Sequence, residues 1–185
     1  IKALKDLEVP MTIIGDFDFY HDENPIKKIF TELGGNWDDI KADFNKVKKA
    51  IDSKRPELEA AALKAEIDSI FESFSERVIP EQKIKAVQEA LKKSSPWAQA
   101  KASGKAYLPS CDATTAFFRL QAAFKEKNIH ILEIGEIEAF DKSIGGHGPK
   151  WVNRVLGKDL VGSMELAEAR TFVRTNILTL ECNLS

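Results

Sequence analysis

The chain has 185 residues, of which 43% are hydrophobic and 30% are charged. This length and this balance of residues are typical of a soluble globular domain with its own core, and they exclude a disordered segment. The formal net charge of -2 gives no overall attraction for nucleic acid. Any contact with DNA must therefore come from local clusters of basic residues.

Other features of the sequence bear on the compartment and on the extent of the protein. No apolar run reaches the ~20 residues that a membrane-spanning helix needs, and residues 1 to 8 mix charged and apolar residues, unlike a signal peptide. We therefore expect a cytoplasmic protein. Cys111 and Cys182 lie far apart without Cys-x-x-Cys spacing, which predicts neither a zinc site nor a disulfide framework. Because the chain starts at Ile1, without an initiator methionine, we expect a fragment of a larger protein.

The first predicted strand is Val9 to Ile14, which is short, nearly all apolar and rich in β-branched residues. Such a run is typical of a strand that is buried on both faces of a parallel sheet, and Gly15 ends it. Pro25 then predicts the start of a short helix, and Gly34 predicts its end after Leu33.

The next part of the chain, from Asn36 to about Lys93, has a helical pattern throughout. Apolar residues recur at spacings of three and four, and Pro56 and Pro80 predict the starts of a second and a third helix. The segment from Ser94 to Ser110 contains two prolines and a glycine, which predicts a loop. The apolar faces of the three helices are Trp37, Ile40, Phe44, Val47 and Ile51, then Leu58, Ala62, Ile70, Phe71 and Phe74, then Ile84, Val87 and Leu91.

The remaining part of the chain returns to a strand. Asp112 or Thr114 can cap a helix that carries Phe117, Leu120 and Phe124 on one face and ends at Asn128. Together, these elements predict an α/β fold with a parallel sheet joined by crossovers. The elements that follow are a strand from Ile129 to Ile134, a loop with three glycines, a helix from Pro149 through Leu156 and a last helix from Ser163 through about Leu178.

Both predicted strands end in the same pattern, which is an apolar run, a glycine and two acids separated by one residue. The two copies are Gly15-Asp16-Phe17-Asp18 and Gly135-Glu136-Ile137-Glu138. Because the carboxyl ends of parallel strands meet at one edge of a sheet, these four carboxylates can converge in one crevice. The alternative interpretation is that each pair is a solvated turn, since acids are common at strand ends.

Converging carboxylates predict a metal site. Like charges a few ångströms apart repel one another, and a divalent cation removes that conflict. Mg²⁺ prefers oxygen ligands, and two such ions ~4 Å apart can stabilise both the attacking water and the leaving oxygen of a phosphodiester. We therefore expect two Mg²⁺ or Mn²⁺ ions, held by Asp16, Asp18, Glu136 and Glu138.

Several lysines are candidates for a catalytic or substrate-binding cation. Lys150 is preferred to Lys142 and Lys158, because it follows the glycine-rich loop and lies at the start of a predicted helix. Lys101 and Lys105, which are interleaved with Trp97 and Tyr107, suit contacts to a phosphate backbone, although the favoured interpretation is an ordinary surface loop.

The histidines are weaker candidates. His147 lies in the glycine-rich loop after the second acidic pair, where it can contact a substrate. We expect His21 to be a surface residue of the loop that follows the first acidic pair, and His130 to be a packed or edge residue of the second strand.

At these residues the chain resembles the Toprim domain of the overcoming lysogenization defect (OLD) family of ATP-dependent nucleases. The resemblance rests on the segment from Ile13 to Asp18, on the helical block to about Lys93 and on the segment from Ile134 to Glu138. It implies a Toprim-like parallel sheet with flanking helices and an inserted helical subdomain. Residues 1–36 would form the first part of the core, 37–110 the insertion and its loop, and 111–185 the second part with the C-terminal helices.

The resemblance also implies a function and a set of partners. It implies a metal-dependent DNA endonuclease in antiphage defence, with both acidic pairs as ligands and a later lysine assisting catalysis. ATP would act only through an ABC-type ATPase domain of the same polypeptide, which this chain lacks. The implied partners are DNA, that ATPase domain, further copies of the protein and, in some cases, a retron reverse transcriptase with its RNA and DNA, but no membrane.

The chain departs from the family pattern in two places, and two other functions stay open. No counterpart precedes Val9 for the glutamate that ends the first Toprim strand, and Arg170 and Arg174 stand where the late lysine is expected. A haloacid-dehalogenase-like phosphatase shares the Asp-x-Asp pattern, but it usually has Thr or Val where this chain has Tyr20. The third possibility is a non-catalytic helical assembly module.

Overall fold

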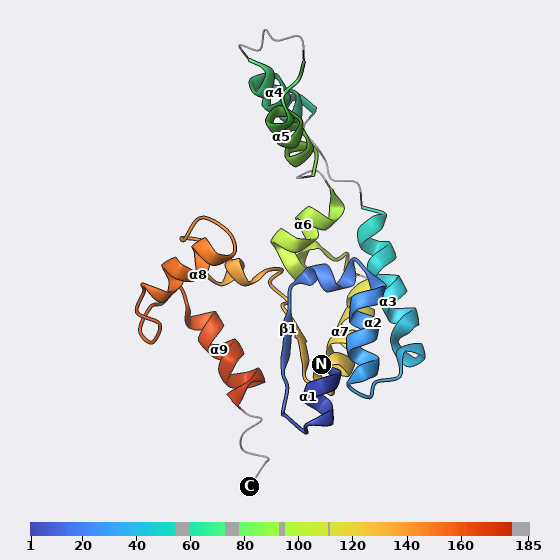
Figure 1. The fold of residues 1–185 in the computed structure, drawn as a ribbon. Coiled ribbons are helices and arrows are strands. Elements are labelled where there is room, and N and C mark those ends of the chain that lie inside the picture. The colour runs from blue at the N-terminus through green and yellow to red at the C-terminus, as the bar shows by residue number, and fades with distance from the viewer. Residues whose placement is uncertain (55–59, 73–77, 93–94, 111, 179–185) are drawn as a thin grey trace.

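The computed structural model describes residues 1–54, 60–72, 78–92, 95–110 and 112–178. These residues are mostly helical and include a two-stranded parallel sheet, so the α/β class is confirmed at this coarse level (Figure 1). The strands are β1 (Ile13–Gly15) and β2 (Ile129–Ile131), and the helices are α1 (Lys2–Asp6), α2 (Glu23–Glu32), α3 (Trp37–Asp52), α4 (Ala60–Phe71), α5 (Glu81–Lys92), α6 (Pro96–Ser103), α7 (Asp112–Lys125), α8 (Pro149–Leu156) and α9 (Ala167–Asn176), with 3₁₀ helices η1 (Phe17–Tyr20), η2 (Gly104–Tyr107) and η3 (Ile137–Asp141).

The sheet pairs two segments that are far apart in the sequence. Ile13 lies opposite Ile129 and Gly15 opposite Ile131, in parallel orientation. Both strands are shorter than predicted. Pro10 lacks the N–H that a longer first strand would need, and Leu132 already begins the turn that leads to the second acidic pair.

An aromatic core fixes the first acidic turn. In η1, Phe17 and Tyr20 lie one turn apart and are fully buried, with their ring centroids 5.2 Å apart. They contact Phe117 of α7, whose ring centroid lies 5.8 Å from Phe17 and 5.6 Å from Tyr20. Burial raises the pKa of Tyr20 well above its usual value. The residue between the two aspartates therefore points into the core, and the aspartates stay at the surface.

The predicted apolar face of the first long helix is confirmed. Trp37, Ile40, Phe44, Val47 and Ile51 of α3 are all buried. The helix packs against α7, and Arg119 donates hydrogen bonds of 2.6 and 2.7 Å to the Asp43 carboxylate. Because this face is covered by the chain itself, it is not free to bind a partner protein.

The predicted loop between Ser94 and Ser110 is wrong, because the structure contains α6 and η2 there. Ser95 caps α6 by accepting a hydrogen bond of 3.0 Å from the backbone N–H of Ala98. Pro96 lies at the first position of the helix, where a missing N–H is harmless. Pro96, which predicts a loop from the sequence alone, therefore begins a helix.

The C-terminal helices also differ in part from the prediction. α8 has the predicted bounds, whereas α9 begins at Ala167 rather than near Ser163. The Ser163 hydroxyl donates a hydrogen bond of 2.6 Å to Glu165 and does not cap the helix. Among the described residues, no helix is both long enough and apolar enough to cross a membrane.

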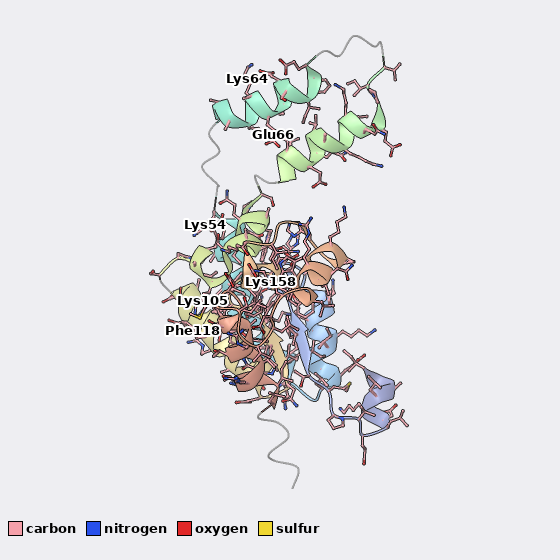
Figure 2. The ribbon with its side chains drawn as sticks, turned by 90° about the vertical axis from the view of Figure 1, so that its left-hand side faces the viewer. Lys54, Lys64, Glu66, Lys105, Phe118 and Lys158 are labelled. Atoms are coloured by element: carbon pink, nitrogen blue, oxygen red, sulfur yellow. The ribbon has the colours of Figure 1, made fainter. Side chains whose placement is uncertain are left out.

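α4 and α5 contact each other and lie together at one end of the molecule, away from the sheet (Figures 1 and 2). The division at residues 37 and 110 stays a prediction, and α3 is part of the aromatic core. On α5, Ile84 and Leu91 are 44% and 47% exposed. The described residues do not include Pro56, Leu58, Phe74, Lys93, Ser94, Cys111 and Cys182.

The aromatic core predicts a sharp contrast between two adjacent phenylalanines. Phe117 is fully buried, whereas Phe118 is 51% exposed. Phe117→Ala should lower the free energy of unfolding by about 3–5 kcal/mol, because it leaves a cavity among rings that cannot collapse. Urea unfolding followed by circular dichroism measures the effect. Phe118→Ala is the matched control, and equal losses in the two variants would contradict this description of the core.

Stability should also depend on His130, which is buried on β2 with no hydrogen-bond partner for Nε2 among the described residues. Burial lowers the pKa of His130 below its usual 6.5, and the charge of Lys125 acts in the same direction. The unfolded chain therefore takes up a proton first as the pH falls, and stability should decrease below about pH 6.5. Urea unfolding at about pH 7.5 and pH 5.5 should show a smaller difference in His130→Gln. His21→Gln, which alters an exposed histidine, is the control, and an unchanged pH dependence in His130→Gln would contradict the assignment.

Candidate metal site

The two acidic turns meet at the carboxyl ends of β1 and β2. The backbone N–H of Phe17 donates a hydrogen bond of 2.7 Å to the carbonyl oxygen of Gly135. The backbone N–H of Ile137 donates one of 3.3 Å to Oδ1 of Asp16. These bonds join the turns directly, so the structure brings Asp16 and Asp18 together with the second acidic pair, as the sequence predicts.

At the position before each acidic pair, there is no room for a side chain larger than that of glycine. A side chain at Gly15 would overlap the ring of Phe19. Gly135 has a φ of +109°, and a Cβ there would overlap the carbonyl oxygen of Lys101. The second acidic turn is therefore in close backbone contact with α6.

A second pair of contacts holds the same two segments together. Gly104 has a φ of +56°, and a Cβ there would overlap the carbonyl oxygen of Glu133. The backbone N–H of Lys105 donates a hydrogen bond of 2.8 Å to that carbonyl. α6 and η2 are thus docked on the residues that lead into the second acidic pair.

This docking places Lys101 in the centre of the acidic cluster. Its Nζ lies 3.0 Å from Oδ2 of Asp18, 3.9 Å from Oδ2 of Asp16 and 3.9 Å from Oε2 of Glu136. The interpretation of Lys101 as a residue of a surface loop is wrong. The signal that would have placed it on a helix is the Ser95-Pro96 start together with the Gly104 stop.

Lys105 lies outside this cluster. Its ammonium pairs with Glu133 at 2.5 Å and lies 6.0 Å from the ring centroid of Phe118, the residue labelled beside it in Figure 2. Tyr107 accepts a hydrogen bond from Lys54 through its carbonyl oxygen. Trp97 stacks against His21, with ring centroids 4.7 Å apart. The basic and aromatic residues of this segment therefore contact the protein itself.

Glu136, Glu138 and His147 form a group that can hold a metal ion, since one ligand atom of each lies within 4.8 Å of the others. Nδ1 of His147 lies 3.9 Å from Oε1 of Glu136 and 3.7 Å from Oε1 of Glu138. The backbone N–H of Gly148 donates a hydrogen bond of 2.8 Å to Glu138, which ties the glycine-rich loop to the acids. Carboxylate and imidazole groups are both ligands of divalent metal ions.

Burial and neighbouring groups shift the pKa values of the acids in different directions. Burial raises the pKa of Asp16, although Lys101 and the N–H of Ile137 oppose the shift. Burial, and next the charge of Glu138, raises the pKa of Glu136. Burial also opposes ionisation of Glu138, but the Gly148 N–H and nearby groups outweigh it, so that its pKa is lowered. A cation would favour the ionised form of all these groups.

The other lysine candidates have different surroundings. Lys150 is exposed in the first turn of α8 and, among the described residues, makes no hydrogen bond or ion pair. Lys142 is also exposed. Lys158, labelled in Figure 2, donates a hydrogen bond of 2.6 Å to the buried Asp141, and this bond lowers the pKa of that carboxyl. We therefore regard Lys158 as structural.

The two arginines of α9 do not take the place of a catalytic lysine in the cluster. Arg170 donates a hydrogen bond of 3.2 Å to the carbonyl oxygen of Leu160. Arg170 and Arg174 line an apolar groove between α9 and the sheet, together with Ile14, Phe140 and Phe172. The other residues that line this groove are mainly apolar, and the charge of Arg170 also acts on Asp159, which is outside the acidic cluster.

Comparison with known proteins found no matching family model, no matching curated protein and no matching solved structure.

The docking of α6 predicts that Gly135 controls the site without carrying any charge. Gly135→Ala should destabilise the fold by about 1–3 kcal/mol through the strained dihedral alone, and it should weaken Mn²⁺ binding because the added Cβ forces the turn that carries Glu136 and Glu138 out of position. Urea unfolding and calorimetric titration with Mn²⁺ measure the two effects. Gly145→Ala is the matched control, since an added Cβ there meets open space. Retention of wild-type stability and metal affinity in Gly135→Ala would show that the contact is unimportant.

Proposed function

We propose that the protein is a metal-dependent DNA endonuclease of the Toprim type, belonging to an OLD-family ATPase–nuclease that acts in antiphage defence. The observation that carries the proposal is the meeting of two acid-x-acid turns at the ends of adjacent parallel strands, joined through the Ile137 N–H and Asp16. Acids from both turns within reach of one ammonium form a donor set that suits hard divalent cations.

In this proposal the carboxylates hold two Mg²⁺ or Mn²⁺ ions. Asp16 and Asp18 supply oxygen ligands from one turn, and Glu136 and Glu138 supply them from the other. When bound, such ions make a bound water acidic and stabilise the leaving oxygen of a phosphodiester. The Ile137 N–H orients Asp16, and the Gly148 N–H orients Glu138, so each carboxylate keeps its remaining lone pairs for the ions.

The glycine-rich loop supplies the groups that would meet the nucleic acid. His147 is 77% exposed above Glu136 and Glu138, where it can complete the metal site or contact a phosphate. Lys150 follows three residues later, and its exposed ammonium, which makes no ion pair with any described residue, is suited to neutralise charge on the phosphate as the bond breaks. We retain Lys150 as the proposed catalytic lysine.

The wider assembly belongs to the same proposal. The chain would form the nuclease module, with a Toprim-like sheet and with the helical insertion extending from it. ATP would be used by an ABC-type ATPase domain of the same polypeptide. DNA, further copies of the protein and, in a retron system, a reverse transcriptase with its RNA and DNA would be the partners, and the compartment would be the cytoplasm.

A haloacid-dehalogenase-like phosphatase is a second candidate, and one contact favours it. The ammonium of Lys101 lies beside both aspartates, where it would support attack by an Asp16 carboxylate on phosphorus. Against it, Tyr20 stands where that class usually has Thr or Val, and it is fully buried. Trapping of a phosphoaspartate analogue with a metal fluoride would favour the phosphatase, whereas nicking of plasmid DNA favours the nuclease.

The proposed function predicts that cleavage needs the first acidic pair. Asp16→Asn and Asp18→Asn should each lower the rate of nicking of supercoiled plasmid by at least about a hundredfold, because each removes a charged ligand of the ions. Removal of metal with EDTA should abolish cleavage, and added Mg²⁺ or Mn²⁺ should restore it.

Glu133→Gln is the control for the loss of one carboxylate. Glu133 lies close to the second acidic pair in sequence but pairs with Lys105 outside the cluster. The Glu133→Gln variant should cleave DNA at a rate within about twofold of wild type. Wild-type cleavage by Asp16→Asn or Asp18→Asn would rule out the metal site.

A further inference from the structure

Among the residues that the structure describes, Lys101 is the one charged group at the centre of the cluster to which the proposed nuclease function gives no role. Its ammonium contacts carboxylates of both turns, at 3.0 Å from Asp18 and at 3.9 Å from Asp16 and Glu136. We propose that Lys101 holds the place of a divalent cation among these acids and moves onto a phosphate oxygen of the nucleic acid when metal binds. The second half of this inference rests on the proposed nuclease function.

The backbone of Lys101 is fixed while its side chain is free to move. Its carbonyl oxygen is in contact with Gly135, and α6 ends at Ser103, just before Gly104, which contacts the carbonyl of Glu133. The side chain itself is 36% exposed, and its ammonium sits at the end of a flexible four-carbon stem. The ammonium can therefore leave the acids without any shift of the helix.

The geometry makes an ammonium and a metal ion alternatives at this position. A divalent ion of this type binds carboxylate oxygens at about 2.0–2.1 Å, so Asp16, Asp18 and Glu136 would have to approach one another to hold it. An ammonium held 3.0 Å from Asp18 and near two more acids occupies the same space. It would also be repelled by the ion, because like charges a few ångströms apart interact strongly where water is partly excluded.

The electrostatics account for where the displaced ammonium goes. The acids that hold the Lys101 ammonium, at 3.0 Å from Asp18 and at 3.9 Å from Asp16 and Glu136, would be neutralised by the metal. A phosphate bound to the same ions would then be the nearest unpaired anion. Lysine binds phosphate as a point charge with donors that rotate, so no exact alignment is needed.

Metal affinity distinguishes this role from a structural one, because the two predict changes of opposite sign. If Lys101 competes with the metal, its removal tightens metal binding. If Lys101 only holds the acids in place, its removal lets them spread apart and weakens metal binding. The comparison is made by calorimetric titration of the wild-type protein and Lys101→Met with Mn²⁺.

Lys105→Met is the matched control. Lys105 lies one helical turn further along the same docked segment, and it also pairs with a carboxylate, but with Glu133 outside the cluster. Lys101→Met should lower the Kd for Mn²⁺ about tenfold, whereas Lys105→Met should leave it unchanged. Unchanged or weaker Mn²⁺ binding by Lys101→Met would overturn the inference. Far-UV circular dichroism of each variant checks that the helices are retained.

Cleavage kinetics test the second half of the inference, which is that Lys101 contacts a phosphate of the bound DNA. At saturating Mn²⁺, Lys101→Met should raise the KM for DNA about tenfold, with a smaller change in kcat, because a contact to the bound phosphate is lost. An unchanged KM would overturn the phosphate contact. The titration requires no cleavage, so the two proposals can fail separately. A wild-type protein that binds Mn²⁺ but leaves DNA intact would contradict the proposed nuclease function. The Mn²⁺ affinities of the wild type and Lys101→Met would still show whether Lys101 competes with the metal ion.

Discussion

The parallel pairing of β1 with β2 is the constraint on which the site depends. Parallel strands present their carboxyl ends at the same edge, and this pairing is what brings two acid-x-acid turns from distant parts of the chain into contact. The hydrogen bond from the Phe17 N–H to the Gly135 carbonyl continues the pairing beyond the strands and into the turns themselves. A shift in register would break this hydrogen bond and the one from the Ile137 N–H to Asp16, so the two acidic pairs would lose their present alignment.

The aromatic core stabilises the first acidic turn, and backbone contact with α6 stabilises the second. Phe17 is buried between its two aspartates, so the core that stabilises the fold also sets the direction of Asp16 and Asp18. The second turn has no such anchor at Ile137, which is 43% exposed, and it depends on α6 packing against Gly135. The two halves of the site thus have different physical supports.

The sequence was informative where the determining pattern is local. The apolar face of α3, the start of α8 at Pro149 and the two acidic turns after glycine can each be recognised within a few residues. The position of Lys101 could not be predicted in this way, because it depends on a third segment docking through Gly104 and Gly135. Pro96 was misleading, since proline disfavours the interior of a helix but is well tolerated at its first position. Strand lengths were overestimated because an apolar run shows where a chain is buried, not how far it is paired.

The order of the paired strands has a consequence for synthesis of the protein. β1 leaves the ribosome roughly 115 residues before β2, since parallel strands need a long crossover between them. At a synthesis rate of about 5–20 residues per second, β2 follows β1 after a delay on the order of ten seconds. Until then, β1, Phe17 and Tyr20 lack their packing partners in the second half of the chain. During that time α2 and α3 can form locally, but Phe17 and Tyr20 have neither α7 nor β2 to pack against. The nascent chain is therefore most exposed to aggregation, or to capture by a chaperone, while the segment between the two acidic turns is being made.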